Sequence, residues 1–261
     1  MTQVNAETLL QDDRQARDQA LFDDIAERYA HKDQHPAASI ARRQRLQQTL
    51  AAAPLPEQPA ILEAGCGAGF SARYLEGQYS QFVGIDYADK LIECAKQSNN
   101  LPGTRFETAN IKSLDMHECF DAVVMIGVLH HMEDTETAMR QMVQTLKPGG
   151  WLLANEPHPG NPIVRLARRL RKRMDNDYSD EQDQLSAKQM RSIYEAAGLT
   201  DIKVVPQGLL STPFAEVPMG PTWLTRPLAR VCCTFDTAVE RSLRPLLGPV
   251  SWNLAVAGRK P

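Results

Sequence analysis

The stretch that decides the fold is Ile61-Leu62-Glu63-Ala64-Gly65-Cys66-Gly67-Ala68-Gly69, and Gly84-Ile85-Asp86 follows it, with Asp86 17 residues after Gly69. The apolar residues before the glycines predict a buried strand, and the glycines predict a tight turn into a helix. The second segment is expected to end another strand in a carboxylate. Such a turn lets backbone N–H groups approach a ligand, and the carboxylate of Asp86 can accept both hydroxyls of a ribose. We therefore expect a pocket for a nucleoside-bearing cofactor.

The spacing of the glycines argues against a dinucleotide-binding dehydrogenase. The fingerprint G-x-G-x-x-G needs its third glycine for close packing of the helix on the strand. Here Gly65-x-Gly67-x-x-Phe70 places a phenylalanine at that position, and no matching catalytic arrangement accompanies it.

The bulk composition fits one α/β domain with additional elements, since the chain has 261 residues of which 43% are hydrophobic. A net charge of −3 argues against a dedicated nucleic-acid binder, and we expect no DNA partner. Five cysteines without a C-x-x-C pair, and no signal peptide at the polar N-terminus, predict a reduced, cytoplasmic protein without a metal site. No run of 18 apolar residues occurs, so we expect no membrane-spanning segment.

Residues 1–56 are expected to form an N-terminal helical lid or extension, and residues 57–261 the main domain. In the main domain, apolar segments of strand length alternate with helical segments, which predicts a doubly wound, mostly parallel sheet with helices on both faces. The strand candidates are Ala60–Ala64, Phe82–Asp86, Thr104–Thr108, Phe120–Ile126 and Trp151–Asn155. The helices expected between them are Ser71–Glu76, Ala88–Gln97 and Thr135–Leu146.

After residue 155 the pattern changes, and we expect helical cap segments over 161–197 and 211–247. The first is expected to hold a helix at Ile163–Met174 and another at Ser186–Ala197. The second is expected to hold a long helix from Pro227 to Leu243, between strands Ile202–Val205 and Trp252–Gly258. One apolar stripe of that helix is expected to face the core, formed by Leu228, Val231, Phe235, Val239 and Leu243.

The glycine stretch resembles the first motif of class I S-adenosylmethionine-dependent methyltransferases, because its pattern is Glu63-x-Gly65-x-Gly67-x-Gly69. Further features follow in the order that this family shows, namely Asp86, the segments Ala109–Ile111 and Phe120–His131, and the turn Leu146–Gly150. The resemblance implies a seven-stranded sheet of order 3-2-1-4-5-7-6 with the last strand antiparallel, an N-terminal helical lid and a late helical insertion. It also implies S-adenosyl-L-methionine as the cofactor.

The resemblance implies a partner for each part of this cofactor. Unpaired backbone N–H groups in the turn of Gly65, Cys66 and Gly67 are expected near its carboxylate. Glu63 is expected to face the cationic amino group. Asp86 is expected to take the ribose hydroxyls, and Tyr87 to flank the adenine.

The remaining cofactor contacts are expected after the third and fourth strands and from the lid. Asn110 can bond the exocyclic amine of the adenine, and Ile111 can offer its N–H to a ring nitrogen. Tyr29 lies in a stretch similar to the N-terminal helix that covers the cofactor in many small-molecule methyltransferases, and it is expected to close over the methionine end unless it only packs on the domain. The wall near the reactive sulfur is expected to be lined by Ile126, Gly127 and His131.

Methyl transfer is an in-line displacement with an excellent leaving group, so the protein mainly supplies alignment, although an oxygen or nitrogen acceptor can also need a base. The candidates for catalysis or acceptor contact are His131, His158 and Glu156, since ligands bind at the carboxyl ends of parallel strands. The alternative for His131 is a wall residue bonded to backbone, and for His158 and Glu156 an ordinary loop position.

We predict a methyltransferase for a small organic acceptor. Apolar residues between Pro213 and Trp223 are in a position to roof its pocket, which favours an apolar or lipid-like acceptor. The basic segment 163–174 can contact an anionic membrane surface or RNA, or form a solvated helix. The alternatives are a tRNA or other RNA methyltransferase, with RNA the less favoured partner, and a non-catalytic cofactor-binding subunit. We expect a monomer or homodimer.

Overall fold

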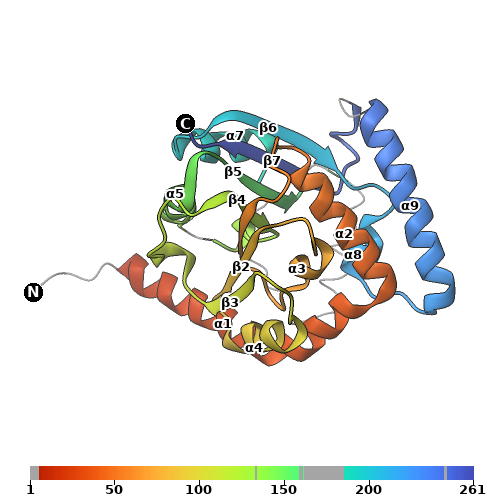
Figure 1. Cartoon of the computed structure of the whole chain (residues 1–261), viewed down its shortest axis with the longest axis horizontal. Coiled ribbons are helices and arrows are strands. Elements are labelled where there is room, and N and C mark those ends of the chain that lie inside the picture. Colours follow the sequence, from red (N-terminus) through yellow and green to blue (C-terminus); the bar gives the residue numbers. More distant parts are fainter. Residues whose placement is uncertain (1–5, 133, 159–160, 162–184, 244–245) are drawn as a thin grey trace, which may run out of the picture.

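The computed structural model describes residues 6–132, 134–158, 161, 185–243 and 246–261. A seven-stranded sheet forms its centre, with the strand order β3-β2-β1-β4-β5-β7-β6 (Figure 1). The strands β1 to β5 pair in parallel, whereas β7 runs antiparallel to both of its neighbours. This arrangement confirms the α/β fold, the strand order and the antiparallel last strand that the sequence predicts.

The early strands lie where the apolar segments predict them, and the late strands are longer. The backbone of β5 is extended from Leu146, which pairs with Phe120 across a register shift, so the turn predicted before this strand lies inside it. β6 runs on to Gln207 because its pairing with β7 continues as far as Asn253. The bounds are β1 (Ala60–Ala64), β2 (Gln81–Asp86), β3 (Thr104–Thr108), β4 (Phe120–Ile126), β5 (Leu146–Pro157), β6 (Thr200–Gln207) and β7 (Asn253–Arg259).

Helices cover both faces of the sheet (Figure 1). Successive residues of a strand point to opposite faces, and accordingly Leu62 and Val83 belong to one buried cluster while Ile61 and Phe82 belong to another. Residues of α5 and α7 complete the first cluster, and residues of α2, α3 and α4 complete the second. The helices are α1 (Ala6–Gln34), α2 (Pro36–Leu50), α3 (Phe70–Tyr74), α4 (Asp89–Ser98), α5 (Thr135–Thr145), α7 (Ala187–Ala196), α8 (Thr212–Glu216) and α9 (Thr222–Leu243), with short 3-10 turns at Ile111–Ser113 and Leu129–His131.

The two N-terminal helices pack on different parts of the domain. Ala26 of α1 lies in a buried cluster with Leu91 of α4. Ala37 and Ala41 of α2 lie in another with Ala229 of α9. The division at residue 56 stays a prediction. Of the predicted cap segments, residues 162–184, and with them the basic segment 163–174, lie outside the described residues.

The orientation predicted for α9 is wrong. The buried positions of this helix are Thr225, Ala229, Cys233, Asp236 and Glu240. The stripe expected in the core instead faces solvent, since the exposed fractions are 64% for Val231, 48% for Phe235 and about the same for Leu228 and Leu243, while Val239 is half-buried.

Polar and small side chains hold α9 in this orientation. Small residues at Ala229 and Cys233 allow a close approach to the alanines of α2. The carboxylate of Asp236 accepts the backbone N–H groups of Leu209, Leu210 and Ser211, and Glu240 accepts that of Gly208. These bonds satisfy four backbone donors, which an apolar face turned inward would leave without these partners.

The helix also begins at Thr222 rather than at Pro227. Leu224 and Thr225 donate their backbone N–H groups to the carbonyl oxygen of Pro221, which closes a first turn ahead of Pro227.

Candidate functional site

The glycine turn between β1 and α3 has the backbone that only glycine adopts readily. Gly65, Gly67 and Gly69 have φ values of +75°, +52° and +74°. At Gly65 a Cβ atom would lie 2.5 Å from Cγ2 of Val128, so the residue must also be small.

The backbone N–H groups of this turn are already bonded within the protein. Gly65 and Cys66 both donate to the carbonyl oxygen of Ile85, at 2.8 and 2.9 Å. Gly67 donates to Oδ2 of Asp86. The N–H groups of these three residues are therefore not unpaired, contrary to the expectation, and their contact with a cofactor stays a prediction.

Asp86 lies at the end of β2, where it is buried. Its Oδ2 accepts the N–H of Gly67 at 2.9 Å and its Oδ1 accepts that of Ala88 at 3.0 Å. Burial raises the pKa of this carboxyl, and bonds from the backbone N–H groups of Ala88, Gly67 and Tyr87 oppose that rise. Since an ionised carboxylate has about four lone-pair sites, Asp86 keeps acceptor capacity for a ribose hydroxyl.

Glu63 is the residue whose environment most clearly calls for a ligand. Its Oε1 accepts a bond from Ser71 Oγ at 2.5 Å, and its buried Oε2 has no partner. Burial raises the pKa of Glu63 to about 8, and the nearby charge of Asp86 adds to the rise. An orphaned carboxylate oxygen of this kind fits a cationic ligand group such as an ammonium, which would restore the ionised form.

A pocket opens in front of Glu63. It lies between the glycine turn and the N-terminal helices, and side chains of α1, α2, α3 and β4 also contribute to its wall. The lining residues are Tyr29, Asp33, Arg42, Arg45, Leu46, Glu63, Gly65, Cys66, Gly67, Phe70, Ser71, Tyr74 and Ile126.

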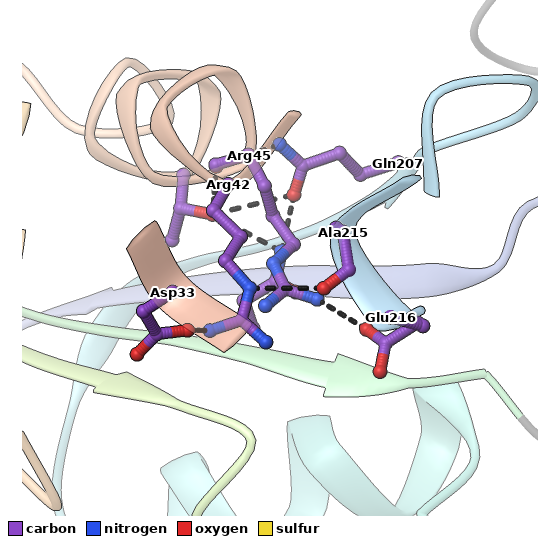
Figure 2. Close-up of polar contacts among 8 residues, drawn as sticks. Asp33, Arg42, Arg45, Gln207, Ala215 and Glu216 are labelled. Atoms are coloured by element: carbon purple, nitrogen blue, oxygen red, sulfur yellow. Dashed lines mark hydrogen bonds and ion pairs between the residues drawn. The ribbon is translucent and has the colours of Figure 1, made fainter. Parts of the chain in front are cut away.

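Two arginines of α2 bring positive charge to this cavity (Figure 2). Arg42 pairs with Asp33, and its Nε donates to the carbonyl oxygen of Ala215 at 2.9 Å. Arg45 bonds Glu216 of α8 at 2.9 Å. Burial alone would raise the pKa of Glu216, but the charges of Arg45, Lys32 and Arg42 hold it at about 2. The two guanidinium groups are thus held in place by partners from α1 and α8.

The backbone of α2 is joined to the sheet through Gln207, which lies near Arg45 (Figure 2). Gln207, at the end of β6, donates to the carbonyl oxygen of Arg45 at 2.9 Å. Asn155, at the end of β5, donates to Gln207 and to Thr49 of α2. These buried amides fix α2 over the carboxyl ends of two strands.

Helix α1 covers the opposite side of the crevice. The ring of Phe22 lies 6.2 Å from those of Tyr29 and Tyr87 and 6.0 Å from that of His131, each edge-on. Gln19 donates to the carbonyl oxygen of Tyr87 at 2.9 Å. Phe22, which the sequence did not single out as a site residue, therefore joins three of the residues that it did.

The loop after β4 is anchored by Glu156, whose carboxylate is fully buried. Oε1 accepts the backbone N–H groups of Val128 and Leu129 at 3.0 and 2.9 Å, and Oε2 lies 2.6 Å from Nδ1 of His130. The rings of His130 and His131 are 4.2 Å apart. Glu156 thus positions this loop and orients His130, a pairing that the sequence did not indicate. Its role in the chemistry stays a prediction.

The other predicted site residues lie around the crevice or away from it. Asn110 follows β3, and its Oδ1 already accepts the N–H of Lys112 at 2.9 Å, while Ile111 is buried beside it. Gly127 follows Ile126, with φ +70°. His158 contacts Ser251 rather than the cavity, and burial lowers its pKa. The structure thus gathers Tyr29, Glu63, Gly65, Cys66, Gly67 and Ile126 around one cavity and does not bring His158 to it.

Three further features concern earlier expectations. Within the part of the chain that the structure describes, no three His, Cys, Asp or Glu side chains gather to hold a metal ion. No described helix is long and apolar enough to cross a membrane. Phe214 is buried and Trp223 is 77% exposed, and neither lines the cavity at Glu63, so a roof over the acceptor stays a prediction.

Comparison with known proteins shows which proteins the chain resembles. Residues 62–154 match the family described as "Methyltransferase domain". Over 107 residues the chain is 30% identical to phthiotriol/phenolphthiotriol dimycocerosates methyltransferase 1 of Mycobacterium ulcerans, which is 40% of each protein. Over 96 residues it is 28% identical to the ubiquinone biosynthesis O-methyltransferase of Nitrosospira multiformis, which is 35% of this chain and 40% of that one. The chain thus matches less than half the length of these curated relatives.

A solved structure extends the likeness over most of the fold. A SAM-dependent methyltransferase from Thermotoga maritima superposes with a TM-score of 0.65 at 17% identity, over 93% of this chain and 99% of that chain. The chain therefore has the class I fold of this structure, and residues 62–154 match a methyltransferase domain. S-adenosylmethionine is the cofactor of this class, and the orphaned oxygen of Glu63, the acceptor sites of Asp86 and the arginines of α2 fit its charged and hydroxyl groups.

Proposed function

We propose that this protein transfers the methyl group of S-adenosylmethionine to a small organic acceptor. The observation that carries the proposal is the unpartnered Oε2 of Glu63, which lies buried at a cavity bounded by a methyltransferase glycine turn. The matched domain family and the class I fold support the same activity.

Different residues of this chain would bind different parts of the cofactor. Glu63 would hold the ammonium group, and Asp86 the ribose hydroxyls. Arg42 and Arg45 would supply the charge that a carboxylate requires, because the N–H groups of the glycine turn are bonded elsewhere. Tyr29, whose ring lies over Gly67, would close the methionine end.

When bound, S-adenosylmethionine supplies a methyl group on a positively charged sulfur. The protein's contribution is alignment and the exclusion of water, and correct positioning can contribute roughly 7–11 kcal/mol. Helix α1, through Phe22, and the loop that Glu156 anchors lie on two sides of the crevice.

A proton from the acceptor would be taken by the histidine pair after β4. With Nδ1 of His130 donating to Glu156, Nε2 of the same ring is left as the acceptor atom. His131 packs against this ring and against Phe22, so it would contact the acceptor or share the proton transfer. General-base assistance of this kind is worth roughly 10²–10⁴-fold in rate.

The acceptor is proposed to be a small, lipid-like or aromatic molecule. The relative in M. ulcerans methylates phthiotriol and phenolphthiotriol dimycocerosates, and the one in N. multiformis acts in ubiquinone biosynthesis. These names support the acceptor class for a chain that shares only the methyltransferase domain with them.

The proposal is tested by transfer of a labelled methyl group from S-adenosylmethionine into extracts of the source cell, fractionated into small molecules, lipids and RNA. We expect label in the small-molecule or lipid fraction, and none with Asp86→Ala. Label confined to RNA would support the RNA methyltransferase instead. Cofactor binding without transfer to any fraction would support a non-catalytic subunit.

A further inference from the structure

The outer face of α9 combines apolar and cationic side chains without an exposed acid. Trp223 is 77% exposed and Val231 64% exposed. Leu224, Leu228, Val231 and Phe235 recur at intervals of four, three and four residues, so they lie along one side of the helix. Single exposed apolar residues are ordinary on protein surfaces, but a continuous row of them marks a contact surface.

The charged residues of α9 differ in exposure according to their sign. Its exposed charged residues are Arg226, Arg230 and Arg241. Its two acidic residues, Asp236 and Glu240, are buried and hold the loop over residues 208–211. Within the described part of the chain, none of the three arginines forms an ion pair. The exposed surface of α9 therefore carries an apolar row on one side and only cationic charge on the flank beyond it, since Arg226 and Arg230 are each two residues from a leucine of the row.

We propose that this face docks α9 on the surface of a membrane that contains anionic lipids. A helix that lies in the membrane interface presents tryptophan, phenylalanine and leucine to the acyl boundary, with arginines beside them for the headgroups. A second copy of the chain is a poorer occupant, because the arginines of two such faces would meet without acids to pair them. Figure 1 shows α9 at the edge of the molecule, with its outer side clear of the other elements.

Docking through α9 would also place the cavity near the lipid. The inner side of α9 packs on Ala37 and Ala41 of α2, and Gln44 of α2 bonds the carbonyl oxygen of Cys233 at 2.8 Å. The same helix α2 carries Arg42 and Arg45 into the cavity. The membrane surface and the cavity would therefore share one rigid helix, although the docking itself does not depend on methyl transfer.

The test is co-sedimentation of the full chain with vesicles of phosphatidylcholine, with and without phosphatidylglycerol. We expect binding to the anionic vesicles that weakens in high salt. Replacing Leu228, Val231 and Phe235 by serine should weaken it roughly a hundredfold, because these side chains lose their apolar burial. Arg226→Gln together with Arg230→Gln should weaken it roughly thirtyfold, since each arginine near an anionic surface contributes roughly fivefold.

Control measurements exclude a folding defect and test whether another basic segment binds the vesicles. The replaced side chains are exposed, so the thermal midpoint and the affinity for S-adenosylhomocysteine should not change. Arg168→Gln together with Arg169→Gln tests the basic segment 163–174 in the same assay and should retain most of the binding. The proposal is overturned if wild type ignores anionic vesicles, if the triple serine variant binds as well as wild type, or if sedimentation shows a dimer that this variant dissociates.

Discussion

The carboxylate of Asp86, at the end of β2, accepts the backbone N–H of Gly67 across 2.9 Å, so one side chain joins the second strand to the glycine turn of the first. Asp86 therefore shapes the crevice as well as offering acceptors to a ribose. The two tasks can be separated by substitution.

Asp86→Ala should abolish binding of S-adenosylmethionine that calorimetry can detect, because both the ribose partner and the anchor of Gly67 are lost. Asp86→Asn keeps one acceptor oxygen and should bind at least about tenfold more weakly than wild type, since charged acceptors form the stronger bonds. Unchanged affinity in the alanine variant would remove Asp86 from the ribose site.

Gly65 and Gly77 form a matched pair for testing the turn. Both have φ near +75°, but a Cβ at Gly65 would meet Val128 at 2.5 Å, whereas nothing lies within 4 Å of one at Gly77. Each substitution by alanine should cost about 1–2 kcal/mol for the left-handed backbone. Gly65→Ala should cost about 1–3 kcal/mol more for overpacking. Denaturant unfolding measures both, and equal losses would show that the contact with Val128 carries no strain.

The pKa of Glu63 predicts how cofactor binding depends on pH. In the free protein this pKa is raised to about 8, so at pH 7 the carboxyl is largely protonated. An ammonium ligand needs the ionised form, and binding below pH 8 must therefore release a proton. Affinity should rise by up to about tenfold per pH unit on the way to pH 8. Above that it should fall, because an α-amino group loses its own proton near pH 7.7–8.0.

Glu63→Gln is the control for this profile. The amide does not titrate, so the fall in affinity on the acid side should disappear while the alkaline fall remains. Calorimetry in buffers of different ionisation enthalpy counts the released proton. An acid limb of the same size in the variant would contradict the placement of the ammonium beside Glu63.

Substitutions at Glu156 distinguish its positioning of the loop after β4 from a role in proton transfer. Glu156→Gln keeps an oxygen for the N–H groups of Val128 and Leu129, whereas Glu156→Ala leaves both unpaired at roughly 1–3 kcal/mol each. The alanine variant should therefore lose stability, and the glutamine variant should mainly lose turnover. Thermal unfolding and steady-state rates measure the two effects.

His131→Ala should lower turnover more than cofactor affinity, and His130→Gln should do so at least as strongly because Glu156 orients that ring. Rates with saturating S-adenosylmethionine, set beside calorimetric affinities, test both variants. Wild-type turnover in either one would take that histidine out of the chemistry.

Most strands could be predicted because they carry apolar segments at regular spacing, with Gly65 to Gly69 and Asp86 marking where two of them end, and the strand order was implied by the family resemblance. Contacts between distant segments could not. Arg45 and Glu216 are 171 residues apart, so nothing local indicates that α2 and α8 meet at the cavity. The pairing of the Gly65 and Cys66 N–H groups is of the same kind, because their acceptor is the carbonyl oxygen of Ile85 in the neighbouring strand.

The orientation of α9 failed for a different reason. An apolar stripe is normally the buried one, but Asp236 and Glu240 satisfy four backbone donors on the other side of this helix. The sequence carries no local sign that those donors exist.

A crystal structure of the chain with S-adenosylhomocysteine tests the central claim most directly. The account predicts the amino group within hydrogen-bond distance of Oε2 of Glu63, with the ribose hydroxyls on Asp86. A crevice left empty at saturating ligand, or an adenine ring lying against Glu63, would contradict it.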